Sequence, residues 1–327
     1  MKISFRITPA LLLTAAVSFI GCGPQADSAA AGDMPESPDA AIQYVAGELA
    51  KGNGTVLWQA MPASYQQDVN AIARLAGTKL DAEIYDHTFA TLARAAAVLD
   101  QQQNFVFESK LAGGPSAEGG SAAQIRTAWP SLKKIIDTLT ASPLATAGGM
   151  QSFDGAAFFE TTVSALLADM DALAKLDPER GDSFLTSLSQ MTVNYVEGTG
   201  DQALLELAVP GQEVESESFL KVEDRWVPQE LAEGWAAQIA ETRSKLEAIN
   251  PEQLAEQKPR ILNVFTMIDG VLTQIEAAET QAQFDQALQG AMMPLMGLMM
   301  MGQGMGSGSA APAMPVTPAM PQAPVAP

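Results

Sequence analysis

The fold class is decided by residues 191–227, which read MTVNYVEGTGDQALLELAVPGQEVESESFLKVEDRWV. Apolar residues alternate with polar ones in this stretch, as in Val193 and Tyr195 and again in Leu205 and Leu207. Alternation with a period of two is typical of half-buried β-strands. Glycine, proline and acidic residues interrupt the pattern at 198–201, 210–211 and 223–225, where turns are expected. The stretch therefore predicts an antiparallel meander of three or four strands.

A small meander needs other elements to cover its apolar face, and the rest of the chain supplies helical patterns. The clearest of these is the stripe Ile261, Phe265, Ile268, Leu272 and Ile275, whose spacing repeats with the helical period. Aromatic residues make up 6% of the chain and hydrophobic residues 47%, much of it alanine, which favours closely packed helices. We expect a mainly α, α+β protein in which the meander at about 191–227 packs on helices.

Start and stop residues give the expected limits of the helices. They are Ser37-Pro38 to Gly52, Pro62 to Gly77, Asp81 to Leu99, about 125–139 with a kink or break at Pro130, Asp154 to Asp177, Gln229 to Ile249, and a last helix from Asn250 that is interrupted near Pro259. These helices and the meander predict one mainly helical domain over 38–290. The Gly/Ser/Ala-rich segment 111–122 is a possible division within it.

The N-terminus has the pattern of a signal peptide over residues 1–21. Lys2 and Arg6 lie in a short basic region, and 7–20 is mostly apolar but too short to span a bilayer. The run ends in Phe19-Ile20-Gly21-Cys22, which resembles the lipobox of bacterial lipoproteins, with Phe19 where Leu is usual. The resemblance implies cleavage before Cys22 and lipidation of its thiol. An ordinary signal peptide followed by a chance cysteine is the alternative.

The same resemblance implies an address. It predicts a secreted protein held at a bacterial membrane by lipid on Cys22, and Gly23, in place of an aspartate, favours the outer membrane facing the periplasm. Residues 22–37 are rich in Ala, Gly, Ser, Asp and Pro and are expected to form a flexible tether.

Charge and cysteine content exclude several classes of function. The formal net charge is −20, so the chain repels phosphate backbones, and we expect no nucleic-acid partner. Its single cysteine excludes an internal disulfide and a cysteine metal cage. No calcium-loop, phosphate-loop or dinucleotide-binding motif is present, and we expect no cofactor.

The C-terminal segment 291–327 is rich in Met, Pro and Ala, and we expect it to be disordered. Met293, Met296 and Met299 are spaced three apart, and thioethers suit monovalent copper, so the segment is a possible Cu(I) site. The alternative is an apolar end that packs on the domain or on a partner, because methionine adapts to irregular surfaces.

Catalytic chemistry has little support in the sequence. His87, beside Asp86, is the only histidine, and no nucleophile elbow accompanies it, so we expect a surface or packing role for it. Each of the four tryptophans is expected in the core or at a helix–sheet contact. We predict no catalytic residues and a non-enzymatic envelope lipoprotein, binding an envelope protein or serving as a structural spacer. Alternatives are Cu(I) binding by the methionines and small-ligand binding between the meander and the helices.

Overall fold

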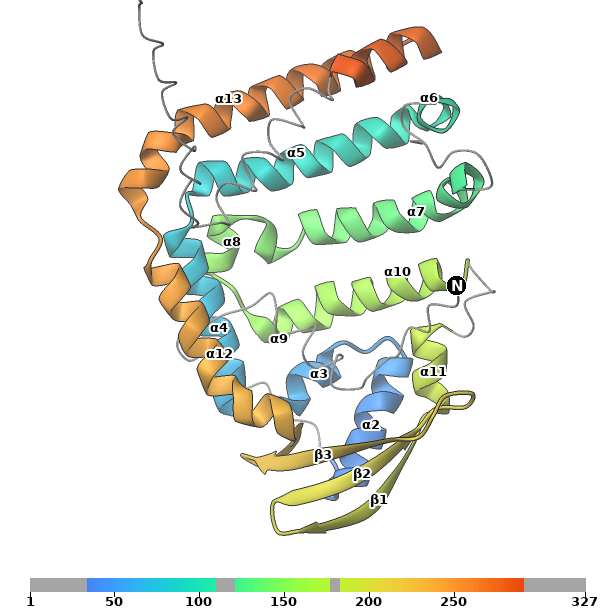
Figure 1. The fold of residues 1–327 in the computed structure, drawn as a ribbon, viewed down its shortest axis with the longest axis vertical. Helices are drawn as coiled ribbons and strands as arrows, with labels where there is room; N and C mark the ends of the chain where they lie inside the picture. Colours follow the sequence, from blue (N-terminus) through green and yellow to red (C-terminus); the bar gives the residue numbers. More distant parts are fainter. Residues whose placement is uncertain (1–33, 110–120, 177–182, 291–327) are drawn as a thin grey trace, which may run out of the picture.

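The computed structural model describes residues 34–109, 121–176 and 183–290, and it is mainly helical with one small antiparallel sheet (Figure 1). The predicted fold class is therefore confirmed. The helices are α2 (Pro38–Ala50), α3 (Thr55–Ala60), α4 (Ala63–Lys79), α5 (Ala82–Gln101), α6 (Gln103–Glu108), α7 (Ser121–Thr140), the 3-10 turn η1 (Pro143–Ala145), α8 (Ala147–Gln151), α9 (Gly155–Phe158), the π-helical turn η2 (Phe159–Val163), α10 (Ser164–Ala174), α11 (Phe184–Gln190), α12 (Gln229–Glu247) and α13 (Pro251–Glu276). Residues 281–290 are also helical.

The sheet is the predicted meander. Its strands β1 (Thr192–Thr199), β2 (Gln202–Ala208), β3 (Glu215–Val222) and β4 (Arg225–Pro228) pair in sequence order, each antiparallel to the next. The side chains of Leu205, Leu207 and Phe219 are buried on one face, where Ile42 of α2 packs against them. Alternation in β2 therefore has the expected cause, since every second residue points to the covering helix.

The largest core cluster joins segments that are far apart in the chain. Phe153 and Phe159 are fully buried in it, and the indole of Trp58 lies 5.5 Å from the Phe159 ring. Tyr65 of α4 stacks on Trp235 of α12 with ring centroids 4.0 Å apart. This cluster fixes α12, which follows the sheet, onto α4, which lies more than a hundred residues earlier in the chain.

Four helices form a single layer, in which α13 lies beside α5, α5 beside α7, and α7 beside α10 (Figure 1). The helices α4 and α12 run across one end of this layer, and the sheet lies below it in the view. A helix within a single layer has neighbours on two sides only, so its two remaining faces have no helix of the layer against them. This arrangement determines which side chains the layer presents to solvent.

A break at Pro130 and an interruption near Pro259 are both wrong, because α7 runs through Pro130 and α13 runs through Pro259. Each proline removes one backbone donor from its helix, and the turns before and after it are nevertheless helical. Gly77 was also expected to end its helix, but α4 continues to Lys79. A Cβ on Gly77 would lie 2.7 Å from the carbonyl oxygen of Ala147, so the glycine is needed for the close approach of α8.

Other predicted boundaries are confirmed. The side chain of Asp81 accepts a hydrogen bond from the backbone N–H of Ile84 and caps α5, and that of Asp154 caps α9. The helix from Asp154 passes through the π-helical turn η2, which the sequence pattern did not indicate, and ends at Ala174 in α10. Most of the proposed division at 111–122 lies outside the described residues, and α5 and α7 on its two sides pack together.

Candidate functional site

Several of the residues singled out by the sequence lie outside the part of the chain that the structure describes. Cys22, the signal peptide 1–21 and the methionines Met293, Met296 and Met299 lie outside the described residues. Within the described ranges, no group of three or more His, Cys, Asp or Glu side chains is placed to hold a metal ion. No helix in the same ranges is long and apolar enough to cross a membrane.

His87 takes part in a contact between α5 and α13. Its Nε2 lies 3.2 Å from Oδ2 of Asp269, and its ring stacks on Phe265 at 4.7 Å. Arg94, two turns further along α5, donates to the other carboxylate oxygen of Asp269 at 3.0 Å. The carboxylate of Asp269 in α13 thus contacts two side chains of α5, His87 and Arg94. This is the packing role expected for the only histidine.

Asp86 does not orient His87 as a catalytic triad would require. Its Oδ1 accepts a 2.7 Å hydrogen bond from the backbone N–H of Ala147, the first residue of α8. Tyr85 donates from its hydroxyl to the carbonyl of Leu144 at 2.7 Å, just before that helix. These two neighbours in α5 therefore hold the turn between α7 and α8.

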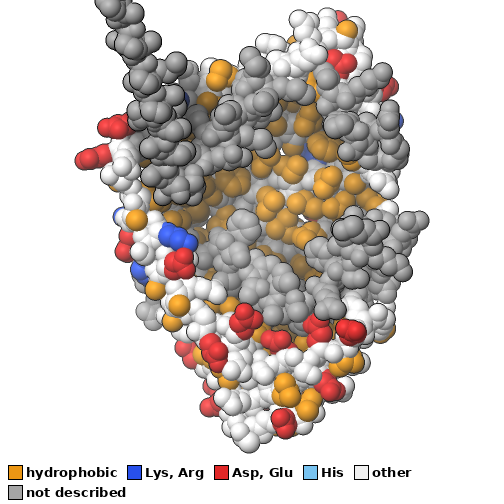
Figure 2. Space-filling model, in the orientation of Figure 1, with side chains coloured by type: hydrophobic (Ala, Val, Ile, Leu, Met, Phe, Trp, Pro, Cys, Tyr) orange, Lys and Arg blue, Asp and Glu red, His pale blue; other side chains and the backbone are white. Residues whose placement is uncertain are grey.

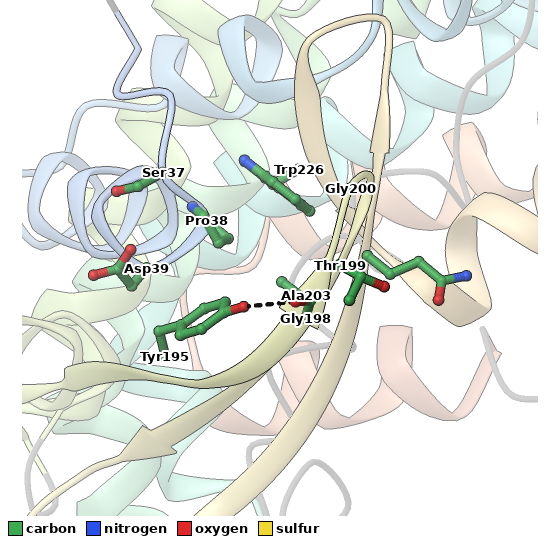
Figure 3. A pocket seen from close by; sticks show the side chains of 10 residues that line it. Ser37, Pro38, Asp39, Tyr195, Gly198, Thr199, Gly200, Ala203 and Trp226 are labelled. Atoms are coloured by element: carbon green, nitrogen blue, oxygen red, sulfur yellow. Dashed lines mark hydrogen bonds between the residues drawn. The ribbon is translucent and has the colours of Figure 1, made fainter.

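An open pocket of about 570 Å³ lies between the start of α2 and the meander (Figure 3). Ser37, Pro38 and Asp39 line it from α2. Its other walls come from the sheet: Tyr195, Gly198, Thr199, Gly200, Gln202, Ala203 and Trp226. Its volume lies within the range of small-molecule sites, and Tyr195 and Trp226 supply two aromatic side chains to its lining.

Hydrogen bonds hold the two aromatic walls of this pocket. The hydroxyl of Tyr195 donates to the carbonyl of Gly198 at 3.1 Å (Figure 3). The indole Nε1 of Trp226 donates to the carbonyl of Glu36 at 2.9 Å and joins the sheet to the segment before α2. Trp226 thus links the sheet to the segment that leads into α2. Its place in a pocket wall was not expected, because residues 36–39 and 226 come together only in the folded chain.

A second candidate site is one face of the helical layer, and α7 shows it most clearly. Ile125, Leu132 and Leu139 are spaced seven apart and share one side of α7, where Ile125 is 48% and Leu139 is 40% exposed. Lys134 lies on the opposite side, whereas Arg126 and Lys133 lie about 100° around the helix from their neighbours in the row. A helix in a globular protein normally buries its apolar side, so exposed apolar residues in such a row call for an explanation.

The two neighbours of α7 extend this row. Leu92 of α5 is 44% exposed and Met170 of α10 is 59% exposed. Figure 2 shows hydrophobic side chains gathered in the middle of the molecule over the layer, whereas Asp and Glu side chains gather over the sheet end. We call the surface formed by Leu92, Ile125, Leu139 and Met170 the apolar face of the helical layer.

Polar side chains of α7 pair with one another and with α5. Lys133 forms a 2.6 Å ion pair with Asp137 one turn later, and this hydrogen bond raises the pKa of Lys133. Trp129 donates from its indole to Asp100 of α5 at 2.8 Å. Lys133 and Trp129 therefore have polar partners, whereas Ile125 and Leu139 on the apolar side of α7 remain exposed.

Comparison with known proteins adds no relative. No protein-family model, no curated protein and no solved structure matches the chain.

Proposed function

We propose that the protein is a lipid-anchored, non-enzymatic binding protein of the bacterial envelope, and that it binds through the apolar face of the helical layer. The observation that carries this proposal is the row of exposed Leu, Ile and Met side chains across α5, α7 and α10. Exposed apolar surface is unfavourable in water unless another molecule covers it for part of the time.

The chemistry of this surface defines its partner. Leu92, Ile125 and Met170 offer no hydrogen bonds or charges, so a charged segment would lose its hydration without compensation. An uncharged segment rich in aliphatic side chains would instead bury apolar area, at about 25 cal/mol per Å² of area removed from water. We therefore expect the partner to be an envelope protein that binds through an exposed, uncharged apolar segment.

The lipobox-like sequence Phe19–Cys22 supports the location. A thioether-linked diacylglycerol on Cys22 would hold the domain at a membrane surface through the segment 22–37. Metabolic labelling with a fatty-acid probe tests this part: wild-type protein is labelled, and Cys22→Ser is unlabelled and released to the soluble fraction. Absence of label on the wild-type protein would show that the sequence is an ordinary signal peptide.

Cross-linking in membranes followed by pull-down tests the binding surface. We expect Leu92→Glu and Ile125→Glu to lose the captured partner at least tenfold, because each places a charge in an apolar contact. Lys134→Glu, on the opposite side of α7, is the matched control and retains capture. Equal capture by all variants would reject this surface, and measurable turnover on envelope polymers would reject the non-enzymatic role.

A second candidate function is small-ligand binding in the pocket of Figure 3, because Tyr195 and Trp226 give it two aromatic walls. A thermal-shift screen against metabolites tests it, with Trp226→Ala as the variant that should lose any shift. Copper binding by Met293, Met296 and Met299 stays a prediction. Truncation after Gly290 would abolish Cu(I) affinity if those thioethers bind the ion.

A further inference from the structure

The described chain ends beside the apolar face of the helical layer. In the helical segment 281–290, Phe284 and Ala287 are buried against Val98 of α5 and Leu272 of α13. Leu288 packs against the same cluster, as does Ala95, which lies one turn from Leu92 on α5. The described part of the chain therefore ends, at Gly290, close to α5, the helix that forms one edge of the apolar face.

The sequence that follows has the composition that this face selects. Residues 291–302 read AMMPLMGLMMMG, which contains six Met and two Leu, and no charged residue occurs after Asp285. Methionine is unbranched and polarisable, so it fits irregular apolar surfaces well. A segment of this kind meets the requirement that the partner be apolar and uncharged.

The segment is also long enough to reach across the face. Packed helices lie about 8–10 Å apart, so the distance from α5 over α7 to α10 is roughly 20 Å. Twelve residues span about 18 Å as a helix and up to ~40 Å when extended. Residues 291–302 can thus extend from Gly290 to Met170 in either form.

We infer that residues 291–302 dock on the apolar face of the helical layer and act as a built-in occupant that a partner must displace. The inference rests on the proposed function for the role of the face, and it adds how the face is regulated. Tethering supplies a high local concentration, in the millimolar range for short linkers, so even weak contacts keep the face covered. A partner then binds only if its apolar segment competes with the chain's own.

Photo-cross-linking in the full-length, membrane-bound protein tests the docking. A benzoylphenylalanine at Ile125 or Leu139 is expected to cross-link to a peptide containing residues 291–302 of the same chain. The probe at Lys134, on the opposite side of α7, is the control and gives no such product. Adducts only with a second copy, with another protein or with lipid, or no adduct at all, would each overturn the inference.

Two truncations test the covering of the face by a separate measurement. Ending the chain after Gly290 removes the segment, and ending it after Gly302 removes only the sequence beyond it. We expect the first to raise the fluorescence of a hydrophobic dye several-fold and the second to leave it unchanged. Equal dye binding by both truncations would reject the docking. If the wild-type protein captures no partner but still forms the intramolecular cross-link, the proposed partner is rejected and the docking of residues 291–302 stands.

Discussion

The backbone N–H of Ser64 donates a 2.9 Å hydrogen bond to Oε2 of Glu223. Ser64 lies in the first turn of α4, and Glu223 lies in the turn between β3 and β4. Pro62, the N-cap residue of α4, provides no side-chain cap. The carboxylate of Glu223 therefore accepts from the Ser64 N–H, one of the donors that a helix N-terminus leaves without a partner. The contact ties the meander to the helical body.

Replacing Glu223 tests this contact. The hydrogen bond from Ser64 lowers the pKa of Glu223 below its ordinary value of 4.5, so the folded state prefers the ionised form. The carboxylate therefore stabilises the fold above that ordinary value, and the stabilisation disappears as pH falls through the lower, folded-state pKa. We expect Glu223→Gln to cost about 0.3–1 kcal/mol at pH 7 in urea unfolding, the usual effect of a charge at a helix N-terminus.

The pH series supplies the decisive comparison for this prediction. The difference between wild type and Glu223→Gln should shrink between pH 6 and pH 3. Asp224→Asn is the matched control in the same turn. Asp224 is well exposed, and its ion pair with Lys221, at 3.4 Å, is an exposed one that contributes little, so the effect of this substitution should be close to zero. A Glu223→Gln difference that does not shrink at all as pH falls below 4.5 would contradict the stabilising role of this charge.

The approach of α9 to Trp58 gives a prediction about packing. A Cβ on Gly155 would lie 2.2 Å from the six-membered ring of Trp58, and the Gly155 N–H donates to Asn70 at 2.8 Å. Neither group can move away, since Trp58 is buried among phenylalanines. Gly155→Ala should therefore destabilise the protein by about 2–3 kcal/mol, as overpacking of a core does.

Gly270 is the control for this substitution, because it lies within α13 and a Cβ there would meet nothing within 4 Å. Gly270→Ala should stabilise by about 0.5–1 kcal/mol through the lower entropy of the unfolded chain. Thermal unfolding monitored by circular dichroism measures both variants. Similar melting temperatures for the two would show that the Trp58 contact does not limit the site.

The local pattern of the sequence was sufficient to predict the sheet. Leu205 and Leu207 are two residues apart and flanked by turns, and both properties are visible within a dozen residues. The same kind of pattern predicted α7 from the stripe Ile125, Trp129, Leu132, Ile136 and Leu139. It could not show that Ile125 and Leu139 stay exposed, because periodicity reveals that a helix has an apolar side without revealing what covers it.

Contacts between distant parts of the chain were beyond sequence reasoning for a related reason. The partner of His87 is Asp269, on a helix that lies beside α5 only after folding. The pocket walls Pro38 and Trp226 are likewise brought together by the strand order. A break at either proline was mispredicted because proline disfavours a helix interior without forbidding it, and α7 and α13 both continue past their prolines.

Asp81 gives a prediction in which two roles can be separated. Its side chain caps α5, and it also forms a 2.9 Å ion pair with Lys258 of α13. The hydrogen bond from Lys258 is the main cause that lowers the pKa of Asp81 below 3.8. Its stabilisation is thus present above that ordinary value and lost as pH falls through the folded-state pKa.

Two substitutions of Asp81 distinguish the cap from the ion pair. Asparagine can still cap a helix, so Asp81→Asn should remove the ion pair and the pH dependence alone. Asp81→Ala should cost a further ~1 kcal/mol, the usual contribution of an N-cap. Urea unfolding at pH 7 with and without 0.5 M salt measures both effects. Equal stability of the two variants would mean that the cap contributes nothing here.

Glu217 of β3 is expected to destabilise the fold at neutral pH. It pairs with the fully buried Leu205 on the covered face of the sheet. Burial is the main cause that raises its pKa above 4.5, and the nearby carboxylates of Glu230 and Glu215 add to it. A raised folded-state pKa means that the ionised form costs stability at pH 7, and that this cost is relieved as pH falls through the folded-state pKa.

Glu217→Gln should accordingly stabilise the protein at pH 7, by less than ~1 kcal/mol for a half-buried group. The gain should vanish below the ordinary carboxyl pKa, where both states of the wild type are protonated. Glu206→Gln, on the opposite face of β2, is the control and should change little at any pH. Chemical denaturation at pH 7 and pH 4 measures the difference, and a loss of stability in Glu217→Gln at pH 7 would show that its charge is favourable in the sheet.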